Sequence, residues 1–418
     1  MKDSGIDWIG KIPDEWEINK IDSLYTLRNT KVSDKNYPPL SVTMKGIVPQ
    51  LATAAKSDDG DNRKLVKKGD FVINSRSDRR GSSGISNYEG SVSLINTILT
   101  PRGRMNPDYY NWLFHTVQFE DEFYKWGHGI VDDLWTTRWQ DMKNISVLVP
   151  PEEAQEKIAN FLDKKCAQID SIIEESKKSI EEYKTWKQSM IFEAVTGKNL
   201  SCKKKNSGIE WISEIPETWE VKRLKCIIDS FEKGNGITKE EVFPDGDTFC
   251  VRYGEIYSKY DNSFENCFSK TFKDKIPVKK YFSNGDLLFA GTGELVEEIG
   301  KCIAYLGNGQ CLAGGDIIIA KHKQNAKFLS YVMNSHYVQA QKSCNKAKLK
   351  VVHISATEIG NVLLALPPLS EQKSIAKFLD AKCAQIDSLI SEKQSLIKDL
   401  AEYKKSLIFE AVTGKRRV

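Results

Sequence analysis

The sequence has few of the features that mark secreted, membrane or metal-binding proteins. Its nine cysteines are spread over 418 residues without a CxxC pair or a tight cluster, which argues against a disulfide framework or a structural zinc site and predicts reduced thiols. No stretch approaches the ~18 apolar residues of a membrane span, and the N-terminus lacks the apolar segment of a signal peptide. We therefore expect a soluble, cytoplasmic protein with no metal site and no membrane contact.

A strong charge excess is also missing. The net charge of +4 suits a polyanionic partner without identifying one. With 40% hydrophobic and 28% charged residues the composition is that of a globular protein. Because single domains usually comprise ~100–200 residues, a chain of this length predicts two or more domains.

Catalytic and nucleotide-binding motifs are absent as well. No GxxxxGK[ST] sequence occurs, and the glycine pairs Gly234/Gly236 and Gly291/Gly293 lack the rest of a dinucleotide fingerprint. The five histidines show neither HExxH nor HxxxH spacing. These absences predict a chain without catalytic residues and without a bound nucleotide cofactor.

Two motifs occur twice, in the same order. The first, SGIDWIGKIPDEWEINKI at Ser4–Ile21, is matched by SGIEWISEIPETWEVKRL at Ser207–Leu224, an offset of 203. A longer motif begins at Pro150 and again at Pro367, ends in IFEAVTGK both times, and keeps an offset of 217 without a gap. The segments between the motifs, as in KKGDFVINS and SNGDLLFAG, are related more loosely, and the second is 14 residues longer. This pattern predicts a duplicated unit whose middle part has diverged.

The long motif is expected to form a helix of about 45 residues. Its proline pairs suit a first helical turn, and Gly197 and Gly414 stand where a left-handed C-cap favours glycine. Interleaved spacings of three and four predict a coiled-coil seam. The seam positions of the first copy are Leu162, Cys166, Ile169, Ile173, Ser176, Ile180, Tyr183, Lys187, Met190 and Ala194. Those of the second copy are Leu379, Cys383, Ile386, Ile390, Lys393, Ile397, Leu400, Lys404, Leu407 and Ala411.

Each seam is the natural partner of the other. At ~1.5 Å per residue such a helix is ~65–70 Å long, and the domain between the two copies lets the chain return, so that the helices can pack antiparallel. The predicted fold class is α+β: two mixed α/β domains separated by an antiparallel coiled coil of two long helices, with a pseudo-twofold internal duplication. Two questions stay open. Each helix could instead lie on its own domain, and Lys187 and Lys404 either fix the register or extend to solvent at frayed ends.

Several stretches resemble one known family over essentially the whole chain. SGIDWIGKIP, CAQIDS, FEAVTGK and GDFVINSRSDRRGSSGISNYEG resemble the specificity subunit of type I restriction–modification enzymes. The resemblance implies two target-recognition domains that each read one half of a bipartite DNA sequence, with two spacer helices as a ruler. The domains expected are a first recognition domain with its N-terminal motif (1–150), a central helix (151–197), a linker with the second motif copy (198–220), a second recognition domain (221–366) and a C-terminal helix (367–418).

The resemblance also implies partners. They are double-stranded DNA, two methyltransferase subunits that use S-adenosylmethionine on the exocyclic amine of adenine, and restriction subunits that join through them and use ATP and Mg. The chain itself is expected to bind no cofactor and to lack catalysis, and it has no [DNS]PP[YFW] tetrapeptide of an adenine methyltransferase. Because duplex grooves repeat every ~10–10.5 base pairs, a coiled coil of fixed length can set the spacer between the half-sites.

Base contacts require forked or planar donors, and phosphate contacts require mobile cations. In the first domain the segment SRSDRRGSSG holds three arginines with Asp78 as the opposing charge; the alternative is a solvated surface loop. Lys45 follows the strand-like LSVTM and aligns approximately with Arg252 of the second domain. The residues predicted to contact DNA in the first domain are Lys45, Arg76, Arg79, Arg80, His128 and Arg138.

In the second domain basic and aromatic residues interleave after the strand-like FCV, a texture of nucleic-acid contacts and equally of half-buried strand edges. The segment KSCNKAKLK carries four lysines without an acid, which suits phosphate attraction. The residues predicted to contact DNA here are Arg252, Tyr253, Lys259, Tyr260, Lys342, Lys346, Lys348 and Lys350.

The apolar residues of the short motif are not explained by DNA contact. They are Trp8, Ile12 and Trp16 with their copies Trp211, Ile215 and Trp219. Two roles remain open for them: packing against the base of a neighbouring helix, and anchoring a methyltransferase subunit. Two other functional classes also compete with a specificity subunit. One is a structural coiled-coil adaptor with two ligand-binding modules, and the other is a standalone DNA-processing enzyme.

Overall fold

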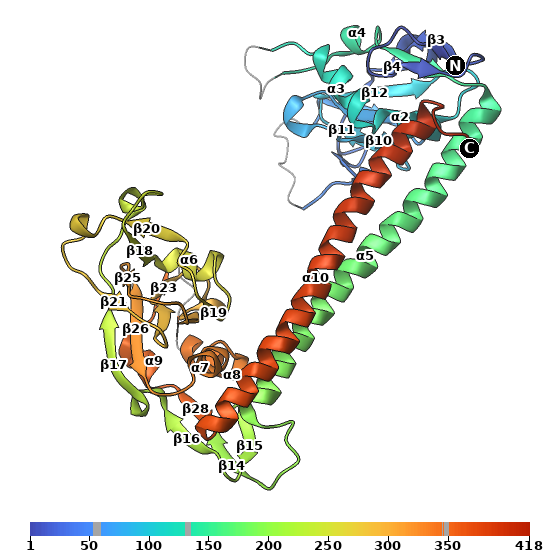
Figure 1. Cartoon of the computed structure of the whole chain (residues 1–418). Coiled ribbons are helices and arrows are strands. Elements are labelled where there is room, and N and C mark those ends of the chain that lie inside the picture. The colour runs from blue at the N-terminus through green and yellow to red at the C-terminus, as the bar shows by residue number, and fades with distance from the viewer. Residues whose placement is uncertain (53–59, 130–134, 345, 347–350) are drawn as a thin grey trace. The chain divides into compact units, whose positions relative to one another are not determined.

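The computed structural model describes residues 1–52, 60–129, 135–344, 346 and 351–418. The chain forms two compact units, Met1–Lys177 with Gln394–Val418, and Lys178–Lys393 (Figure 1). Each unit combines one globular domain with part of each long helix. The domain bounds predicted from the sequence instead treat each long helix as a separate segment, and they stay a prediction. None of the described helices is long and apolar enough to span a membrane.

The first domain is built from short strands and short helices. Its elements are β1 (Lys2–Asp3), β2 (Lys11–Ile12), β3 (Glu17–Lys20), α1 (Ile21–Leu24), β4 (Tyr25–Arg28), β5 (Lys31–Val32), β6 (Leu40–Thr43), β7 (Gly46–Pro49), β8 (Arg63–Val66), β9 (Phe71–Asn74), η1 (Ser77–Arg79), β10 (Ser83–Ile85), β11 (Gly90–Val92), β12 (Asn96–Pro101), α2 (Pro107–Phe114), α3 (Val117–Lys125), α4 (Trp139–Met142) and β13 (Ser146–Val149). The sheets follow the orders β10-β9-β12-β4, β11-β8-β5, β13-β3, β6-β7 and β1-β2.

The second domain repeats this plan with additional strands. Its elements are β14 (Lys204–Ile209), β15 (Ile212–Pro216), β16 (Glu220–Arg223), η3 (Leu224–Cys226), β17 (Ile228–Lys233), η4 (Lys239–Glu241), β18 (Thr248–Val251), α6 (Tyr253–Ser258), β19 (Ser263–Phe264), β20 (Ser269–Thr271), η5 (Lys273–Lys275), β21 (Tyr281–Phe282), β22 (Leu287–Ala290), β23 (Thr292–Gly293), η6 (Val296–Glu298), β24 (Cys302–Tyr305), β25 (Cys311–Ala313), β26 (Ile317–His322), α7 (Ala326–Met333), α8 (His336–Ser343), β27 (Val352–His353), α9 (Ala356–Gly360) and β28 (Leu363–Leu366). Its larger sheets follow the orders β17-β26-β22-β24-β19 and β20-β18-β25-β21.

The central sheets of the two domains share their strand order and their register. Strands β4, β12, β9 and β10 of the first domain correspond to β17, β26, β22 and β24 of the second. Thr97 pairs with Ile73 in one sheet, and Ile318 pairs with Phe289 at the same place in the other. A one-residue slip would turn every side chain to the opposite face, so this shared register means that the two cores were kept in place while the sequences diverged.

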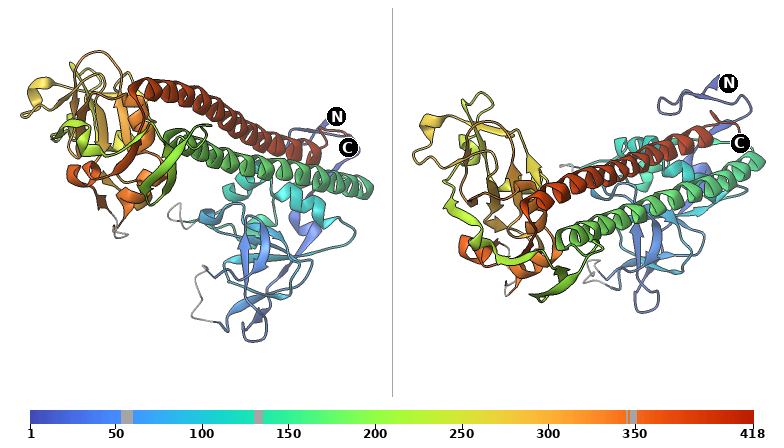
Figure 2. Two further views of the ribbon diagram at one scale, coloured as in Figure 1. Left: turned by 90° about the horizontal axis from the view of Figure 1, so that it is seen from below. Right: turned by 60° about the horizontal axis from the view of Figure 1, so that its bottom comes forward.

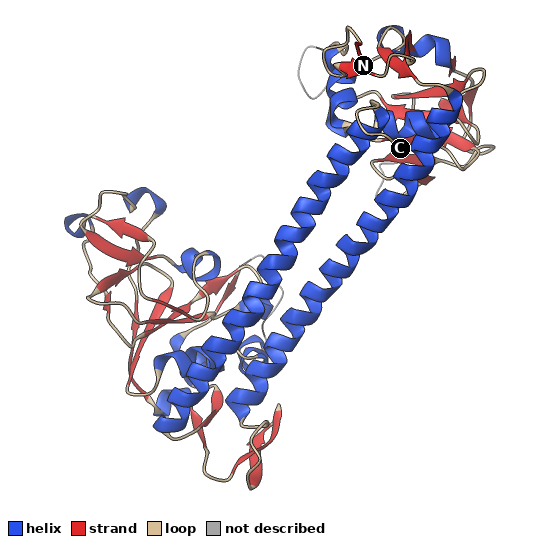
Figure 3. Ribbon diagram, turned by 45° about the vertical axis from the view of Figure 1, so that its right-hand side comes forward, coloured by secondary structure: helices blue, strands red, loops and turns tan. Residues whose placement is uncertain are grey.

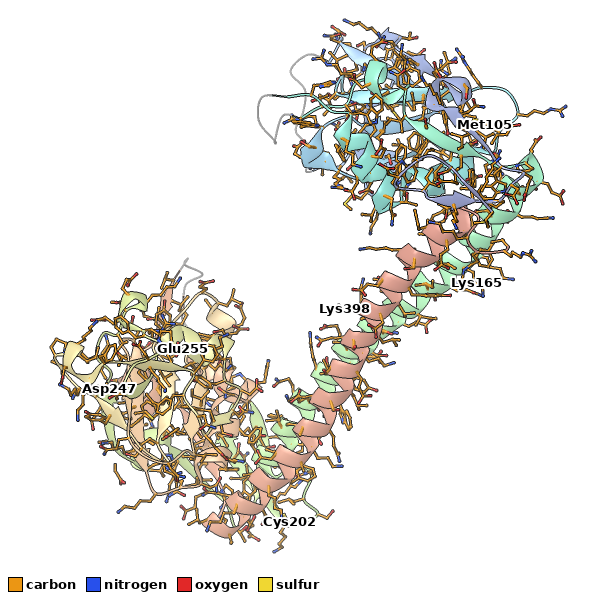
Figure 4. All side chains as sticks on the ribbon, turned by 45° about the horizontal axis from the view of Figure 1, so that its top comes forward. Met105, Lys165, Cys202, Asp247, Glu255 and Lys398 are labelled. Carbon is orange, nitrogen blue, oxygen red and sulfur yellow. The ribbon has the colours of Figure 1, made fainter. Side chains whose placement is uncertain are left out.

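Two long helices leave these domains, α5 (Glu152–Thr196) and α10 (Leu369–Val412). In each unit a segment of α5 runs beside an oppositely directed segment of α10 (Figures 1, 2 and 3). Every predicted seam position is buried or half-buried, whereas the residues between them are mainly exposed along the middle of each helix. Lys165 of α5 and Lys398 of α10 lie on the exposed faces (Figure 4). The antiparallel coiled coil predicted from the repeat is thus confirmed.

Hydrogen bonds at the two helix starts repeat the duplication. Gln155 Nε2 donates to the Pro150 carbonyl at 2.7 Å, and its Oε1 accepts from Asn106 N at 2.9 Å. Gln372 makes the same pair of bonds, to Pro367 O at 2.9 Å and from Asn325 N at 3.0 Å. Because the two asparagines are the N-caps of α2 and α7, each long helix is tied at its first turn to a short helix of its domain.

The helix ends are also duplicated. Gly197 and Gly414 adopt φ of 70° and 69°, the left-handed conformation that the predicted caps require. The next residues close the caps, since Lys198 N donates to Glu193 O at 3.0 Å and Lys415 N donates to Glu410 O at 2.9 Å. The Gly-Lys pair of IFEAVTGK therefore terminates a helix, in agreement with the interpretation from the sequence.

The short motif packs against these helix ends. Ile12 and Trp16 are buried in one core with Leu407 and Ala411 of α10. In the other unit Ile215 and Trp219 are buried with Ile191 and Ala194 of α5, and the Trp219 indole donates to Glu371 Oε2 of α10 at 2.9 Å. The packing role is confirmed for these four motif residues. Trp8 is half-buried against Phe119, and Trp211 remains 38% exposed.

The two lysines that interrupt the seam form ion pairs between the helices. Lys187 Nζ lies 2.7 Å from both carboxylate oxygens of Asp387. Lys404 Nζ lies 2.7 Å from both oxygens of Asp170. The pairs are related by the 217-residue offset and lie in different units. This arrangement favours the register role over lysines that extend to solvent.

Candidate nucleic-acid interface

The two domains share one parallel bridge and differ in structure directly after it. In the first domain Pro39 forms a parallel bridge with Ser91, and in the second Cys250 forms one with Leu312. The partner residues lie at equivalent positions, since β11 and β25 pair with β8 and β21 in the same register. Past the bridge, the first domain continues as the hairpin β6–β7, whereas the second forms helix α6.

This register corrects one expectation from the sequence. Lys45 lies in the turn of the β6–β7 hairpin, where its backbone N–H donates to Thr43 Oγ1 at 3.1 Å and its side chain is exposed. Arg252 comes two residues after its parallel bridge, so the corresponding residue of the first domain is Ser41. The predicted equivalence of Lys45 and Arg252 is therefore wrong by four residues, because the loops before this point differ in length.

The arginine segment of the first domain meets more acids than the sequence suggested. Arg76 and Arg79 face Asp78, with Nε to carboxylate distances of 3.2 and 3.8 Å. Arg80 pairs with Glu120 and Asp121 of α3, and its guanidinium stacks over Tyr124. Arg79 is the most exposed of the three arginines, with 67% of its side chain accessible. The segment surrounds the short helix η1 at the domain surface, and Arg79 is its most accessible cation for a phosphate.

The two remaining candidates of the first domain lie near α4. His128 is 77% exposed, and its Nε2 lies 3.3 Å from Asp141 Oδ1. Arg138 is exposed and occupies the N-cap position of α4 without a side-chain capping bond. A backbone bridge between Arg76 and Thr136 and another between His128 and Thr136 bring the arginine segment and His128 to one edge of the domain.

In the second domain Arg252 is held by a buried carboxylate. Arg252 Nε and Nη2 donate to Glu255 Oε1 at 3.1 and 2.9 Å, and its backbone N–H donates to Oε2 at 3.1 Å. Glu255 is only 4% exposed and also accepts from Ser269 Oγ. A buried carboxylate is costly unless it is paired, so Arg252 compensates its charge while 28% of the arginine side chain stays exposed.

Lysines and exposed aromatic rings surround this arginine. Lys259 Nζ lies 4.4 Å from the ring centroid of Phe268, which is 65% exposed. Tyr253 is 41% exposed. Tyr260, by contrast, is 8% exposed and its hydroxyl accepts from Phe268 N. This tyrosine therefore belongs to the core, and its prediction as a DNA contact is wrong.

The predicted lysine-rich phosphate loop is corrected in the same way. Lys342 is 3% exposed and donates to the Gly300 carbonyl at 2.8 Å, and burial lowers the pKa of its amine to about 7. Lys346 pairs with Glu358 and donates to the His353 carbonyl. Neither amine is free for a phosphate in this arrangement. Lys348 and Lys350 lie outside the described residues.

Some features of this surface escaped sequence reasoning. Phe249 is 46% exposed beneath Lys270, and Lys275 lies 3.9 Å from the ring centroid of Phe243. Apolar residues in a β-rich segment predict core, so the sequence offered no signal for exposed rings. Glu255 was missed because an arginine three residues before a glutamate is not a recognised capping pattern. Among the described residues no cluster of three or more His, Cys, Asp or Glu side chains is placed to hold a metal.

Comparisons with known proteins agree with this architecture. The family model described as "Type I restriction modification DNA specificity domain" matches residues 13–182 and 216–399. The MjaVIII type I restriction enzyme specificity subunit of Methanocaldococcus jannaschii is 25% identical over 438 residues, which cover 98% of this chain and 94% of that protein. The EcoBI specificity subunit of Escherichia coli is 32% identical over 99 residues, 24% of this chain and 20% of that protein.

Two solved structures share the fold. One, from a study of complex assembly and conformational transition of the type I R-M system, has a TM-score of 0.74 at 15% identity and is matched over 97% of this chain and 100% of that chain. The HsdS subunit from Thermoanaerobacter tengcongensis has a TM-score of 0.56 at 16% identity, over 97% and 98% of the two chains. At these identities the likeness concerns the fold alone.

Proposed function

Since this chain belongs to the type I restriction–modification specificity subunits and carries two of their DNA specificity domains, we propose that each domain reads one half of an asymmetric bipartite DNA target. One observation supports the assignment of one half-site to each domain more strongly than the others. The two domains keep one sheet register but differ where the β6–β7 hairpin of the first is replaced by α6 in the second. A common scaffold with different surfaces suits two half-sites of different sequence.

The long helices set the spacer between the half-sites in this proposal. Both are unbroken over their full bounds, and each is fixed at its start by a glutamine and at its end by a buried motif copy. The two ion pairs between the helices hold one register. A coiled coil fixed in this way favours half-sites at a constant separation along the duplex.

Catalysis belongs to partner subunits in this proposal. Two methyltransferase subunits dock at the pseudo-equivalent helix ends and methylate adenine with S-adenosylmethionine, and restriction subunits that require ATP and Mg join through them. The chain itself binds no cofactor. Exposed Leu200, which follows the end of α5, and exposed Trp211, in the turn between β14 and β15, supply apolar contact area for such docking. All nine cysteines are free thiols, which fits the reducing cytoplasm where the DNA lies.

A domain exchange tests the proposal. Replacing residues 18–149 with the corresponding domain of another specificity subunit, in a complex reconstituted with a methyltransferase subunit, should change one half of the methylated sequence and leave the other half and the spacer as they were. The reciprocal exchange of residues 221–366 is the matched control and should change the other half only. Methylation maps in which either exchange alters both halves would reject the assignment of one half-site to each domain.

A further inference from the structure

A cleft of about 580 Å³ opens beside Arg252 in the second domain, within the part of the chain that Figure 4 marks by Glu255. It is lined by the loop 236–239 and by Arg252, Tyr253, Lys259 and Phe268. We call it the Arg252 cleft. The carboxylates on its wall are Glu255, which is bound to Arg252, and Asp316, which lies 3.4 Å from Lys233. The cleft therefore presents cations and aromatic rings, and both carboxylates that line it are paired.

The carboxylate of Glu255 occupies one edge of the Arg252 guanidinium. A guanidinium has five N–H donors, and Glu255 Oε1 takes those of the Nε and Nη2 side. Among the described residues none accepts from Nη1. The end-on pair of Nη1 and the second Nη2 hydrogen is thus left available and held in a defined direction. This pair matches two adjacent acceptors on a planar partner.

We propose that Arg252 reads a guanine in the half-site of the second domain, with its end-on fork on the O6 and N7 acceptors in the major groove. The proposal rests on the proposed function and adds the base and the residue that recognises it. Guanine presents two acceptors side by side in this groove, and a bidentate arginine is the commonest specific contact to it. Because the buried carboxylate already holds the arginine in one conformation, binding costs less side-chain entropy. This favours contact with a single base edge over a mobile phosphate contact.

The rim of the cleft supplies the accompanying backbone contacts. Lys259 extends over the exposed ring of Phe268, and the exposed Tyr253 lines the same cleft. Lysines held against aromatic rings are suited to contact the phosphates and sugars on either side of the recognised base. The first domain has Ser41 at the place of Arg252, so the two domains are expected to recognise different bases at corresponding steps of their half-sites.

The test compares Arg252 variants in the complex reconstituted with a methyltransferase subunit, on a pool of duplexes randomised in both half-sites. For the wild type we expect a G·C pair in the half-site of the second domain. Arg252→Ala and Arg252→Lys should reduce the preference for this pair by about 10- to 100-fold and leave the first half-site unchanged. Lysine keeps the charge beside buried Glu255, so Arg252→Lys tests the fork even if the alanine variant folds poorly. Arg223→Ala, on the exposed face of β16, is the matched control and should keep the wild-type preference.

Each outcome separates the inference from the proposed function. If the wild-type complex selects no bipartite sequence, the proposed function fails and the inference fails with it. If the wild type selects one but Arg252→Lys keeps the same preference at every position of the second half, the inference alone is overturned. A uniform loss of methylation with unchanged sequence preference would assign Arg252 to a phosphate and would overturn the inference as well. Glu255 acts as a positioning residue because it holds the Arg252 guanidinium. We therefore expect Glu255→Gln to lower the guanine preference as well.

Discussion

Reversing one interhelical ion pair tests whether the two pairs fix the register of α5 and α10. Lys187 and Asp387 are 22% and 48% exposed as side chains, so their pair is worth ~0–1 kcal/mol. The variant Lys187→Glu replaces this attraction by a repulsion of similar size, so that local opening of the helices should become easier by about 1–2 kcal/mol. That difference corresponds to about 5- to 30-fold faster amide exchange where exchange occurs by local opening.

Hydrogen exchange read by mass spectrometry resolves this effect along the chain. Peptides from 180–195 and 380–395 should exchange faster in Lys187→Glu, whereas the helix segments around Lys404 and Asp170 should keep their rates because they lie in the other unit. Adding Asp387→Lys should restore most of the protection. The matched control is Lys184→Glu, which breaks a contact within α5 to Glu181. Equal effects of Lys184→Glu and Lys187→Glu, or no recovery in the double variant, would refute the register role.

Two further predictions follow from the same structure. A heptad inserted into each helix, between Ile173 and Ile180 and between Ile390 and Ile397, lengthens the helices by ~10.5 Å, about three base pairs of duplex. The insertion should therefore lengthen the spacer of the methylated target or abolish binding. An unchanged spacer would show that the helices do not set it. Burial lowers the pKa of Lys342 to about 7, so between that pH and ~10.4 the unfolded chain binds more protons and stability should rise with pH. Lys342→Met should flatten the rise of the urea midpoint with pH, and parallel profiles for variant and wild type would contradict this.

The coiled coil could be predicted because its signals are local and repeated. The seam spacing and the cap glycine occur in both copies at a constant offset, and burial follows the seam position by position. Lys187 and Lys404 could be identified as interruptions of the seam, but their partners Asp387 and Asp170 lie on the other helix, and only the packed register shows which acids they meet.

The candidate site was harder to predict because its chemistry depends on contacts distant in sequence. Lys342 stands in a run of lysines, yet tertiary packing buries it against the Gly300 carbonyl. Lys45 was aligned with Arg252 through loops of unequal length, and strand pairing shows Ser41 at that place. Arg252 itself was identified, whereas the buried carboxylate of Glu255 that orients it became visible only in the folded domain.

A methylation map of a reconstituted complex shows directly whether this chain directs methylation to a bipartite sequence. The purified chain is combined with a methyltransferase subunit and S-adenosylmethionine, and modified adenines are located by long-read sequencing of the treated DNA. We predict methylation at one asymmetric bipartite sequence with a constant spacer, and none with either protein alone. Methylation without a bipartite motif, or methylation by the isolated chain, would contradict it.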